Sequence, residues 1–210
     1  MRFVFLFLSA GLGFGQPFIV SMKSLQEQYV SSQANKTLEK AKRACSDQAW
    51  EKCRKLIDQS LAQNPRSRQG LLMSGVLAIQ DQDYRKAGRV LDVAVEEDPT
   101  EPFLLSVAAL VHGLLNDYKA AENLAKRSLR RDPLGSRANF VLGLSLIIQN
   151  RDFPEAERSF SRSASEVKEA RLFLSYLQLR RGQVESATEE CRKFLGQPDA
   201  GLEACLALLK

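Results

Sequence analysis

The sequence predicts an all-α fold, a right-handed α-solenoid of about five helical hairpins followed by a C-terminal capping helix. Three prolines, Pro65, Pro99 and Pro133, follow one another at a constant spacing of 34 residues, and each comes directly after Asn or Asp. Between them apolar residues recur at helical spacing, and no strand pattern is evident. A fixed period of this length is typical of stacked helical repeats, whose core forms between neighbouring units.

The composition excludes one class of partner. Hydrophobic residues make up 44% of the 210 residues and charged residues 26%, which is ordinary for a globular protein. The net charge of +5 is spread along the chain, without a Lys/Arg run longer than two. The pairs Arg130-Arg131 and Arg180-Arg181 fall where helices should end, and there cations interact favourably with the helix dipole. We therefore expect no nucleic-acid partner.

The N-terminus has the features of a secretory signal peptide, residues 1–15. A positively charged start precedes an apolar run over residues 3–12, and small residues follow up to Gly15. Cleavage after Gly15 would leave Gln16 first, and we expect a periplasmic or secreted protein. The alternative is an uncleaved anchor, because the apolar run could extend through Val20. Only in that case do we expect contact with a membrane.

An apolar segment, residues 16–33, separates the signal peptide from the repeats. It contains Phe18, Ile19, Val20, Met22 and Leu25. We expect it to dock on the repeats or on a partner. The rest of the chain divides into the repeat array, residues 34–198, and the capping helix, residues 199–210.

Two amphipathic helices are predicted between Arg68 and Pro99. The first has an apolar stripe over residues 71–79, Asp81-Gln82-Asp83 interrupts the pattern, and a second stripe covers residues 84–95. The second helix ends before Pro99, because a residue that precedes proline disfavours the helical conformation. Neither helix can bury its stripe without the next hairpin, so the hairpins must stack.

This pattern resembles the tetratricopeptide repeat family. In the family a first helix carries a small residue, and the second helix opens with an aromatic residue, followed by alanine, a bulky residue, another small residue and a closing proline. The best copy carries these as Gly75, Tyr84, Ala87, Leu91, Ala94 and Pro99. The other copies carry Ala41, Trp50, Cys53, Ile57, Ser60 and Pro65; Ala109, Tyr118, Ala121, Ala125, Ser128 and Pro133; Gly143, Phe153, Ala156, Phe160 and Ser163; and Ser175, Val184, Ala187, Cys191 and Phe194. The resemblance covers about residues 34–197, and its small residues would let paired helices approach closely.

The ends of the array depart from the family pattern. The fourth copy has one extra residue in its turn, Gln149-Asn150-Arg151-Asp152, and lacks the closing proline. The first helix of the first copy, residues 34–41, is polar, which predicts a cap that faces solvent. After Pro198, we expect Asp199 to N-cap a last helix that covers the open end of the stack.

Export would make the four cysteines candidates for disulfides. Four cysteines allow three pairings. Pairings between the two ends would require the tips of an extended solenoid to meet, so we predict the local pairs Cys45–Cys53 and Cys191–Cys205. The alternative is that all four are reduced and act as small buried apolar residues.

Catalytic and cofactor-binding residues are not apparent. His112 is the single histidine and falls on an apolar stripe, and the cysteines lack the Cys-x-x-Cys spacing of a zinc site. There is also no glycine-rich loop after a strand. We expect no enzyme activity, no metal and no small-molecule cofactor.

The resemblance implies that the first helices line a concave face, which in this family usually holds an extended peptide or a helix. Carried over to this chain, the lining residues are Leu72, Met73, Val76 and Ile79; Phe103, Val107, Leu110 and Leu114; Phe140, Val141, Leu144, Ile147 and Ile148; and Leu172, Phe173, Tyr176 and Leu179. A contiguous apolar surface of this size marks an interface, unless superhelical curvature and the capping helix bury it.

We therefore expect a non-enzymatic module that binds a partner protein or peptide through an apolar groove. One alternative is a structural component of a cell-envelope complex, such as pilus, secretion or outer-membrane machinery, held by its edges. Homodimerisation through the groove is another.

Overall fold

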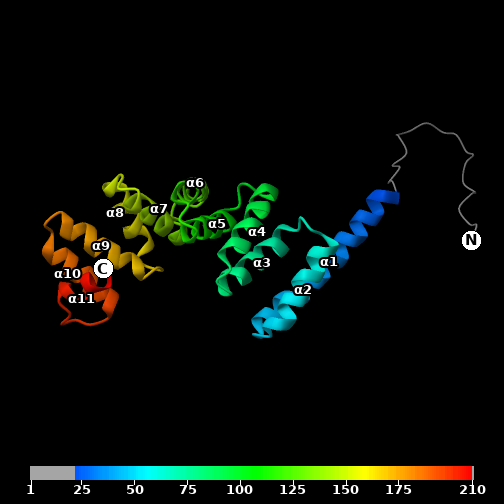
Figure 1. Cartoon of the computed structure of the whole chain (residues 1–210), viewed down its shortest axis with the longest axis horizontal. Coiled ribbons are helices and arrows are strands. Elements are labelled where there is room, and N and C mark those ends of the chain that lie inside the picture. The colour runs from blue at the N-terminus through cyan, green and yellow to red at the C-terminus, as the bar shows by residue number, and fades with distance from the viewer. Residues whose placement is uncertain (1–21, 210) are drawn as a thin grey trace, which may run out of the picture.

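A computed structural model describes residues 22–209 of the chain (Figure 1). The predicted signal peptide, residues 1–15, and the start of the apolar segment, residues 16–21, lie outside the described residues. All the secondary structure that is described is helical, and none of these helices has the length and apolar character of a membrane span. The helices are α1 (Met22–Ser46), α2 (Trp50–Gln63), α3 (Arg68–Gln80), α4 (Tyr84–Glu97), α5 (Pro102–Leu114), α6 (Tyr118–Leu129), α7 (Ser136–Ile148), α8 (Phe153–Ser163), α9 (Glu169–Arg180), α10 (Val184–Leu195) and α11 (Leu202–Leu206), which a short 3₁₀ helix (Ala207–Leu209) follows.

Consecutive helices pair into five hairpins, from α1–α2 to α9–α10, and each hairpin packs on the next. The array is elongated, with α1 at one end and α9 to α11 at the other (Figure 1). The predicted all-α solenoid of helical hairpins is therefore confirmed.

The small residues of the repeat are required by close approach between paired helices. A Cβ atom at Gly75 would lie 2.7 Å from Leu91 Cδ2, and one at Gly143 would lie 2.8 Å from Phe160 Cζ. Leu91 and Phe160 are fully buried, so they fill the space that each glycine leaves. A larger residue at either glycine would push the two helices of its hairpin apart.

The turn inside each central hairpin follows one design. Gln82 and Asn116 adopt positive φ angles of 60° and 63°, and the next residue is an aspartate that caps the second helix. Asp83 accepts a hydrogen bond from the Lys86 backbone N–H at 3.0 Å, and Asp117 accepts one from Ala120 at 3.1 Å. These caps satisfy backbone donors that the first turn of a helix leaves unpaired.

The fourth turn accommodates its extra residue without losing the cap. Asn150 and Asp152 both have positive φ angles, 53° and 33°. The Asp152 carboxylate still accepts a hydrogen bond from the Glu155 N–H at 3.0 Å. The inserted Arg151 side chain is thereby directed back toward the third hairpin.

At the N-terminal end, α1 runs without a break across the boundary that the sequence suggested between residues 33 and 34. The predicted solvent-facing character of residues 34–41 is wrong for one side of the helix. Ala34, Leu38 and Ala41 are buried, and the Ser60 hydroxyl of α2 donates a hydrogen bond of 2.9 Å to the Ala34 carbonyl. Residues 34–41 are polar on average, but three apolar residues at helical spacing give this part of α1 one apolar side, which packs against α2.

At the C-terminal end, α11 is shorter than the predicted capping helix. Gly201, not Asp199, is its N-cap residue, so the predicted cap is wrong. Asp199 lies within a turn that the Ala200 N–H closes by donating to the Gln197 carbonyl, two residues before the cap. The helix nevertheless packs against the last hairpin, where Leu172, Cys191 and Cys205 form a small buried cluster.

The cysteines lie in the two local pairs that the sequence predicts. The Cα atoms of Cys45 and Cys53 are 5.2 Å apart, and those of Cys191 and Cys205 are 5.9 Å apart, both within the range of a disulfide. The first pair joins α1 to α2, and the second joins α10 to α11. Each pair therefore fastens one end of the array.

Candidate partner-binding groove

The first helices of the two hairpins at the centre of the array, α5 and α7, pack on one another, and α3 contacts α5 more slightly. No pair of successive second helices among those described packs as extensively as α5 and α7 do. We call the surface of the first helices α3, α5, α7 and α9 the first-helix face.

The first-helix face exposes apolar side chains. Val76 is 43% exposed and Phe103 is 48% exposed, and Leu114 and Ile148 are exposed where their helices end. The other predicted lining residues that reach the surface are half-buried: Leu72, Met73, Ile79, Leu110, Phe140, Leu144, Ile147, Phe173, Tyr176 and Leu179. The face is therefore partly accessible, with half-buried side chains between the exposed ones.

Three predicted lining residues belong to the core. Val107, Val141 and Leu172 are 4%, 2% and 8% exposed, so their predicted place on an open groove is wrong. Val141 and Leu172 each adjoin a half-buried phenylalanine in sequence, and neighbouring residues of an α-helix point about 100° apart. Val107 is enclosed because successive first helices pack on one another, and Leu172 packs with Cys191 and Cys205 beneath the C-terminal helix.

The first-helix face contains a cleft of about 800 Å³ at the N-terminal ends of α5 and α7. Of the predicted groove residues, Phe103, Leu110 and Phe140 line it. Its other lining residues, none of which the sequence predicted as part of the groove, are Glu101, Pro102, Ser106, Ser128, Asp132, Leu134, Gly135, Ser136, Arg137, Ala138, Glu166 and Val167.

The wall of this cleft is an arginine stacked on an aromatic ring. The Arg137 guanidinium carbon lies 4.9 Å from the centre of the Phe103 ring. Its Nη1 also lies 3.4 Å from the Ser106 hydroxyl oxygen. A cation over a ring face is attracted by the ring quadrupole, so these contacts hold Phe103 at the surface of the cleft.

A cluster of three phenylalanines holds Phe140 from behind. The rings of Phe140 and Phe160 meet edge to face at 5.9 Å, and Phe140 meets Phe173 in the same way at 6.0 Å. Phe160 and Phe173 stack at 5.1 Å. Because the cluster includes residues of α7, α8 and α9, it fixes Phe140 relative to two hairpins.

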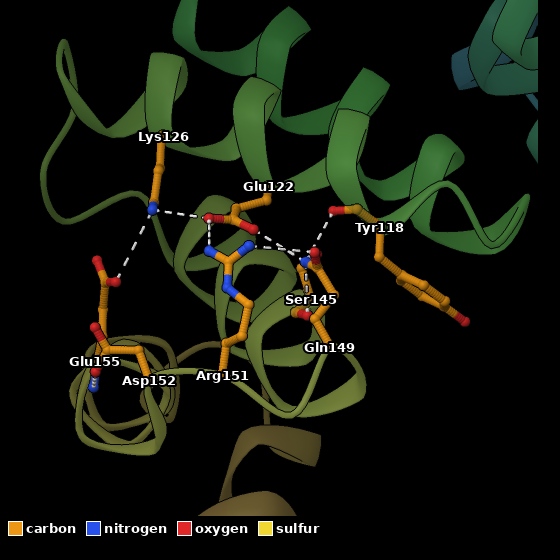
Figure 2. A network of polar contacts seen from close by, with 8 residues as sticks. All are labelled: Tyr118, Glu122, Lys126, Ser145, Gln149, Arg151, Asp152 and Glu155. Carbon is orange, nitrogen blue, oxygen red and sulfur yellow. Dashed lines mark hydrogen bonds and ion pairs between the residues drawn. The ribbon is translucent and has the colours of Figure 1, made fainter.

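A polar network joins α6 of the third hairpin to the turn after α7 in the fourth and sets the relative position of the two hairpins (Figure 2). None of its residues lines the cleft. Glu122 of α6 is buried and accepts hydrogen bonds from Lys126 at 2.9 Å, Gln149 at 2.9 Å and Arg151 at 3.0 Å. Burial opposes ionisation of Glu122, but the hydrogen bonds from Lys126 and Gln149 outweigh it, so the pKa of Glu122 lies below its ordinary value. The inserted turn of the fourth hairpin thus anchors to α6.

His112 has a structural role that is visible in its contacts. Its Nε2 lies 2.9 Å from Asp92 Oδ1, and its Nδ1 lies 3.8 Å from Asp117 Oδ2. The ring therefore joins the second hairpin to the third. Across the described part of the chain, no group of His, Cys, Asp and Glu side chains is arranged to hold a metal ion.

The sequence profile of the tetratricopeptide repeat matches residues 39–102 and 107–167, more than half of the chain. The chain belongs to the tetratricopeptide repeat family.

Several solved structures are similar to this chain over most of its length. YrrB, described as a repeat protein with an unusual peptide-binding site, is 18% identical, with a TM-score of 0.68 over 89% of this chain and 95% of YrrB. PilW, a type IV pilus biogenesis factor, is 18% identical, with a TM-score of 0.67 over 83% of this chain and 82% of PilW. MamA from Desulfovibrio magneticus RS-1 is 16% identical, with a TM-score of 0.65 over 80% of this chain and 97% of MamA. At these identities the likeness shows the fold alone, and no curated protein sequence matches the chain significantly.

The repeat pattern explains which lining residues sequence reasoning missed. Arg137 stands one helical turn before Phe140 on the same helix, a position that the apolar pattern passes over because the residue is charged. Leu134, Glu166 and Val167 come from loops between repeats, where the family pattern predicts only the closing proline. The one sequence signal for these loops is Leu134, an apolar residue directly after Pro133, and the structure leaves it 73% exposed.

Proposed function

We propose that this tetratricopeptide repeat chain is a non-enzymatic binding module that holds a segment of a partner protein against its first-helix face. Family membership supports a protein or peptide partner, since members generally serve as binding scaffolds. The observation that carries the proposal is the cleft of about 800 Å³ between exposed Phe103 and half-buried Phe140. A cleft of that volume, with aromatic side chains held in place by their neighbours, can accept large apolar side chains of a partner.

The experiment is capture of partners by the purified chain, with Val76→Asp and Phe103→Asp combined in one variant. Both side chains are exposed, so the variant should fold with unchanged helical content. Binding an apolar partner side chain would remove water from each introduced carboxylate without giving it a hydrogen-bond partner. Because this desolvation costs free energy, we expect capture to fall by about tenfold or more. Val184→Asp is the matched control, because Val184 is 48% exposed on α10, a second helix. We call the variant with Val76→Asp and Phe103→Asp the groove variant. If it captures partners as well as the wild type does, the proposal is overturned.

We also propose that the protein is exported, with residues 1–15 removed as a signal peptide. The two cysteine pairs support this, because disulfides persist in oxidising compartments. N-terminal sequencing of the protein purified from its native cell tests the proposal. Gln16 as the first residue supports cleavage, whereas retention of residues 1–15 in the membrane fraction supports the alternative of an N-terminal anchor.

The second candidate function is structural, as an envelope component held by its edges. The likeness to PilW favours it at the level of the fold. In this case Arg89→Glu with Arg158→Glu, on the exposed parts of the second helices α4 and α8, should abolish partner capture, and the groove variant should not. Light scattering of the purified chain tests the further alternative of a homodimer formed through the groove, in which case the groove variant should be monomeric.

A further inference from the structure

The cleft at the N-terminal ends of α5 and α7 differs in charge from the protein that surrounds it. The whole chain carries a formal charge of +5. The charged side chains that line the cleft are three carboxylates, Glu101, Asp132 and Glu166, against the one guanidinium of Arg137. The cleft is therefore locally acidic on a basic protein.

Two of the three carboxylates are available to a partner. Glu101 accepts hydrogen bonds from the backbone N–H groups of Phe103 and Leu104, so it serves as the cap of α5. Asp132 and Glu166 are exposed, and within residues 22–209 neither lies at ion-pair distance from a lysine or arginine. Other carboxylates near neighbouring hairpins do have such partners, including Glu157 with Arg181 and Asp98 with Arg68.

The one cation that lines the cleft is engaged by other groups. Arg137 is stacked on Phe103 and close to Ser106. Arg131 and Lys168 are near Asp132 and Glu166 in sequence, but among the described residues they do not belong to the lining of the cleft. Among the described residues, the cleft therefore supplies no ion-pair partner to Asp132 or Glu166.

The apolar part of the cleft lies among the same residues. Phe103, Leu110 and Phe140 come from the helices, and Leu134 and Val167 come from the loops that also carry Asp132 and Glu166. Leu134 is 73% exposed and Phe103 is 48% exposed, so two large apolar side chains of the same cleft are open to solvent.

We infer that the cleft recognises a partner segment in which a large apolar side chain is flanked by lysine or arginine. The apolar side chain enters between Phe103, Leu134 and Phe140, and the flanking cations pair with Asp132 and Glu166. This inference rests on the proposed function and adds to it the chemistry of the bound segment. Complementary charge at the rim of an apolar site contributes selectivity more than affinity.

The test is selection of a random peptide library, displayed on phage, on the purified full-length chain. Enriched peptides should combine an aromatic or large aliphatic residue with neighbouring lysine or arginine. An exposed ion pair changes affinity by at most about fivefold, so synthetic peptides with two flanking lysines should bind about 2- to 25-fold tighter than their glutamate-flanked counterparts. High salt should reduce this ratio.

The variant Asp132→Asn with Glu166→Gln tests the assignment of the two carboxylates. It preserves the shape of both side chains, and we expect the ratio between lysine- and glutamate-flanked peptides to fall to about one. The matched control is Asp199→Asn with Glu203→Gln, which changes the net charge equally at two exposed positions outside the cleft. Helical content and the unfolding midpoint, measured for both variants, show whether each remains folded.

The possible outcomes distinguish failure of this inference from failure of the proposed function. Enrichment of acidic or purely apolar peptides, with capture still lost in Val76→Asp with Phe103→Asp, overturns the inference and leaves the proposed function standing. An equal loss of preference in the control variant shows a general charge effect and also overturns the inference. No enrichment, together with partner capture that is insensitive to the groove variant, overturns both.

Discussion

The centre of the array and its C-terminal end are held together by different means. From α3 to α8, large buried side chains fit against glycines, as Leu91 fits against Gly75 and Phe160 against Gly143. At the C-terminal end, the buried cluster is reduced to Leu172, Cys191 and Cys205, with Phe194 only half-buried beside it. A stacked hairpin in the centre shares its core with two neighbours, whereas the last hairpin has one neighbour and a short helix. A local covalent link therefore matters most where shared packing is weakest.

The contrast between the two regions fails if side-chain packing contributes less stability in the centre of the array than at its C-terminal end. Phe160→Ala should destabilise the protein by about 3–5 kcal/mol, because it removes a fully buried ring and leaves a cavity between α7, α8 and α9. Phe194→Ala, at the C-terminal end, should cost less than half as much. Chemical denaturation monitored by circular dichroism measures both. Equal costs would show that the end is packed as well as the centre.

The covalent link at the end should give the next largest effect. Replacing Cys191 and Cys205 by serine should cost about 2–3 kcal/mol, the loop-closure value for a link between residues 14 apart. Hydrogen–deuterium exchange should rise in α10 and α11 and stay unchanged in α3 to α6. The control is the variant with Cys45 and Cys53 replaced by serine, which removes the other pair and should leave exchange in α10 and α11 unchanged. A loss of protection in the centre would contradict this prediction.

The polar network of the centre should contribute less than the packing. Glu122→Gln should cost about 1–2 kcal/mol at neutral pH, because a buried acceptor of charge-assisted hydrogen bonds is lost. The pKa of Glu122 is lowered in the folded protein, so its contribution is complete above the unfolded-state pKa of glutamate, near 4.3. It is lost as the pH falls through the lower folded value. Thermal unfolding across acidic pH should show wild type and variant converging, and a constant difference would contradict the ionised state of Glu122.

The smallest effect should come from the corresponding polar group at the C-terminal end. Lys193 lies 3.4 Å from Glu189 and 3.3 Å from Glu190 on the exposed side of α10. Water and salt screen such pairs, so Lys193→Ala should leave the unfolding midpoint unchanged. If Lys193→Ala lowers the unfolding midpoint as much as Glu122→Gln does, burial is not the reason that the two networks would differ in their contribution to stability.

Much of the fold could be predicted because the information is local. The proline period located the hairpins, the small residue of each first helix marked where its partner approaches, and the aromatic residues Tyr84 and Tyr118 marked where second helices begin. The cysteine pairs followed from the elongated shape, since only local pairs can form in an extended stack. The start of α1 could not be predicted from the repeat, because Met22 lies before the first copy and the repeat carries no signal there.

The groove was predicted less completely than the fold. Periodicity identifies the apolar side of a helix, and Val76 and Phe103 are exposed on the first-helix face as expected. It cannot tell how much of that side the next hairpin covers, which is why Val107 and Val141 proved to be buried. The loop residues Leu134 and Glu166 join the cleft only because the loops that precede α7 and α9 lie beside the N-terminal ends of α5 and α7.

The sequence by itself determined the type, number and order of the hairpins, because these depend on spacing along one chain. Only the tertiary structure decided which apolar side chains stay accessible, that Arg137 covers Phe103 thirty-four residues away, and that Arg151 reaches Glu122. These contacts depend on the angle at which one hairpin packs on the next. That angle is set by the summed packing of all the side chains between them, and no local pattern in the sequence records it.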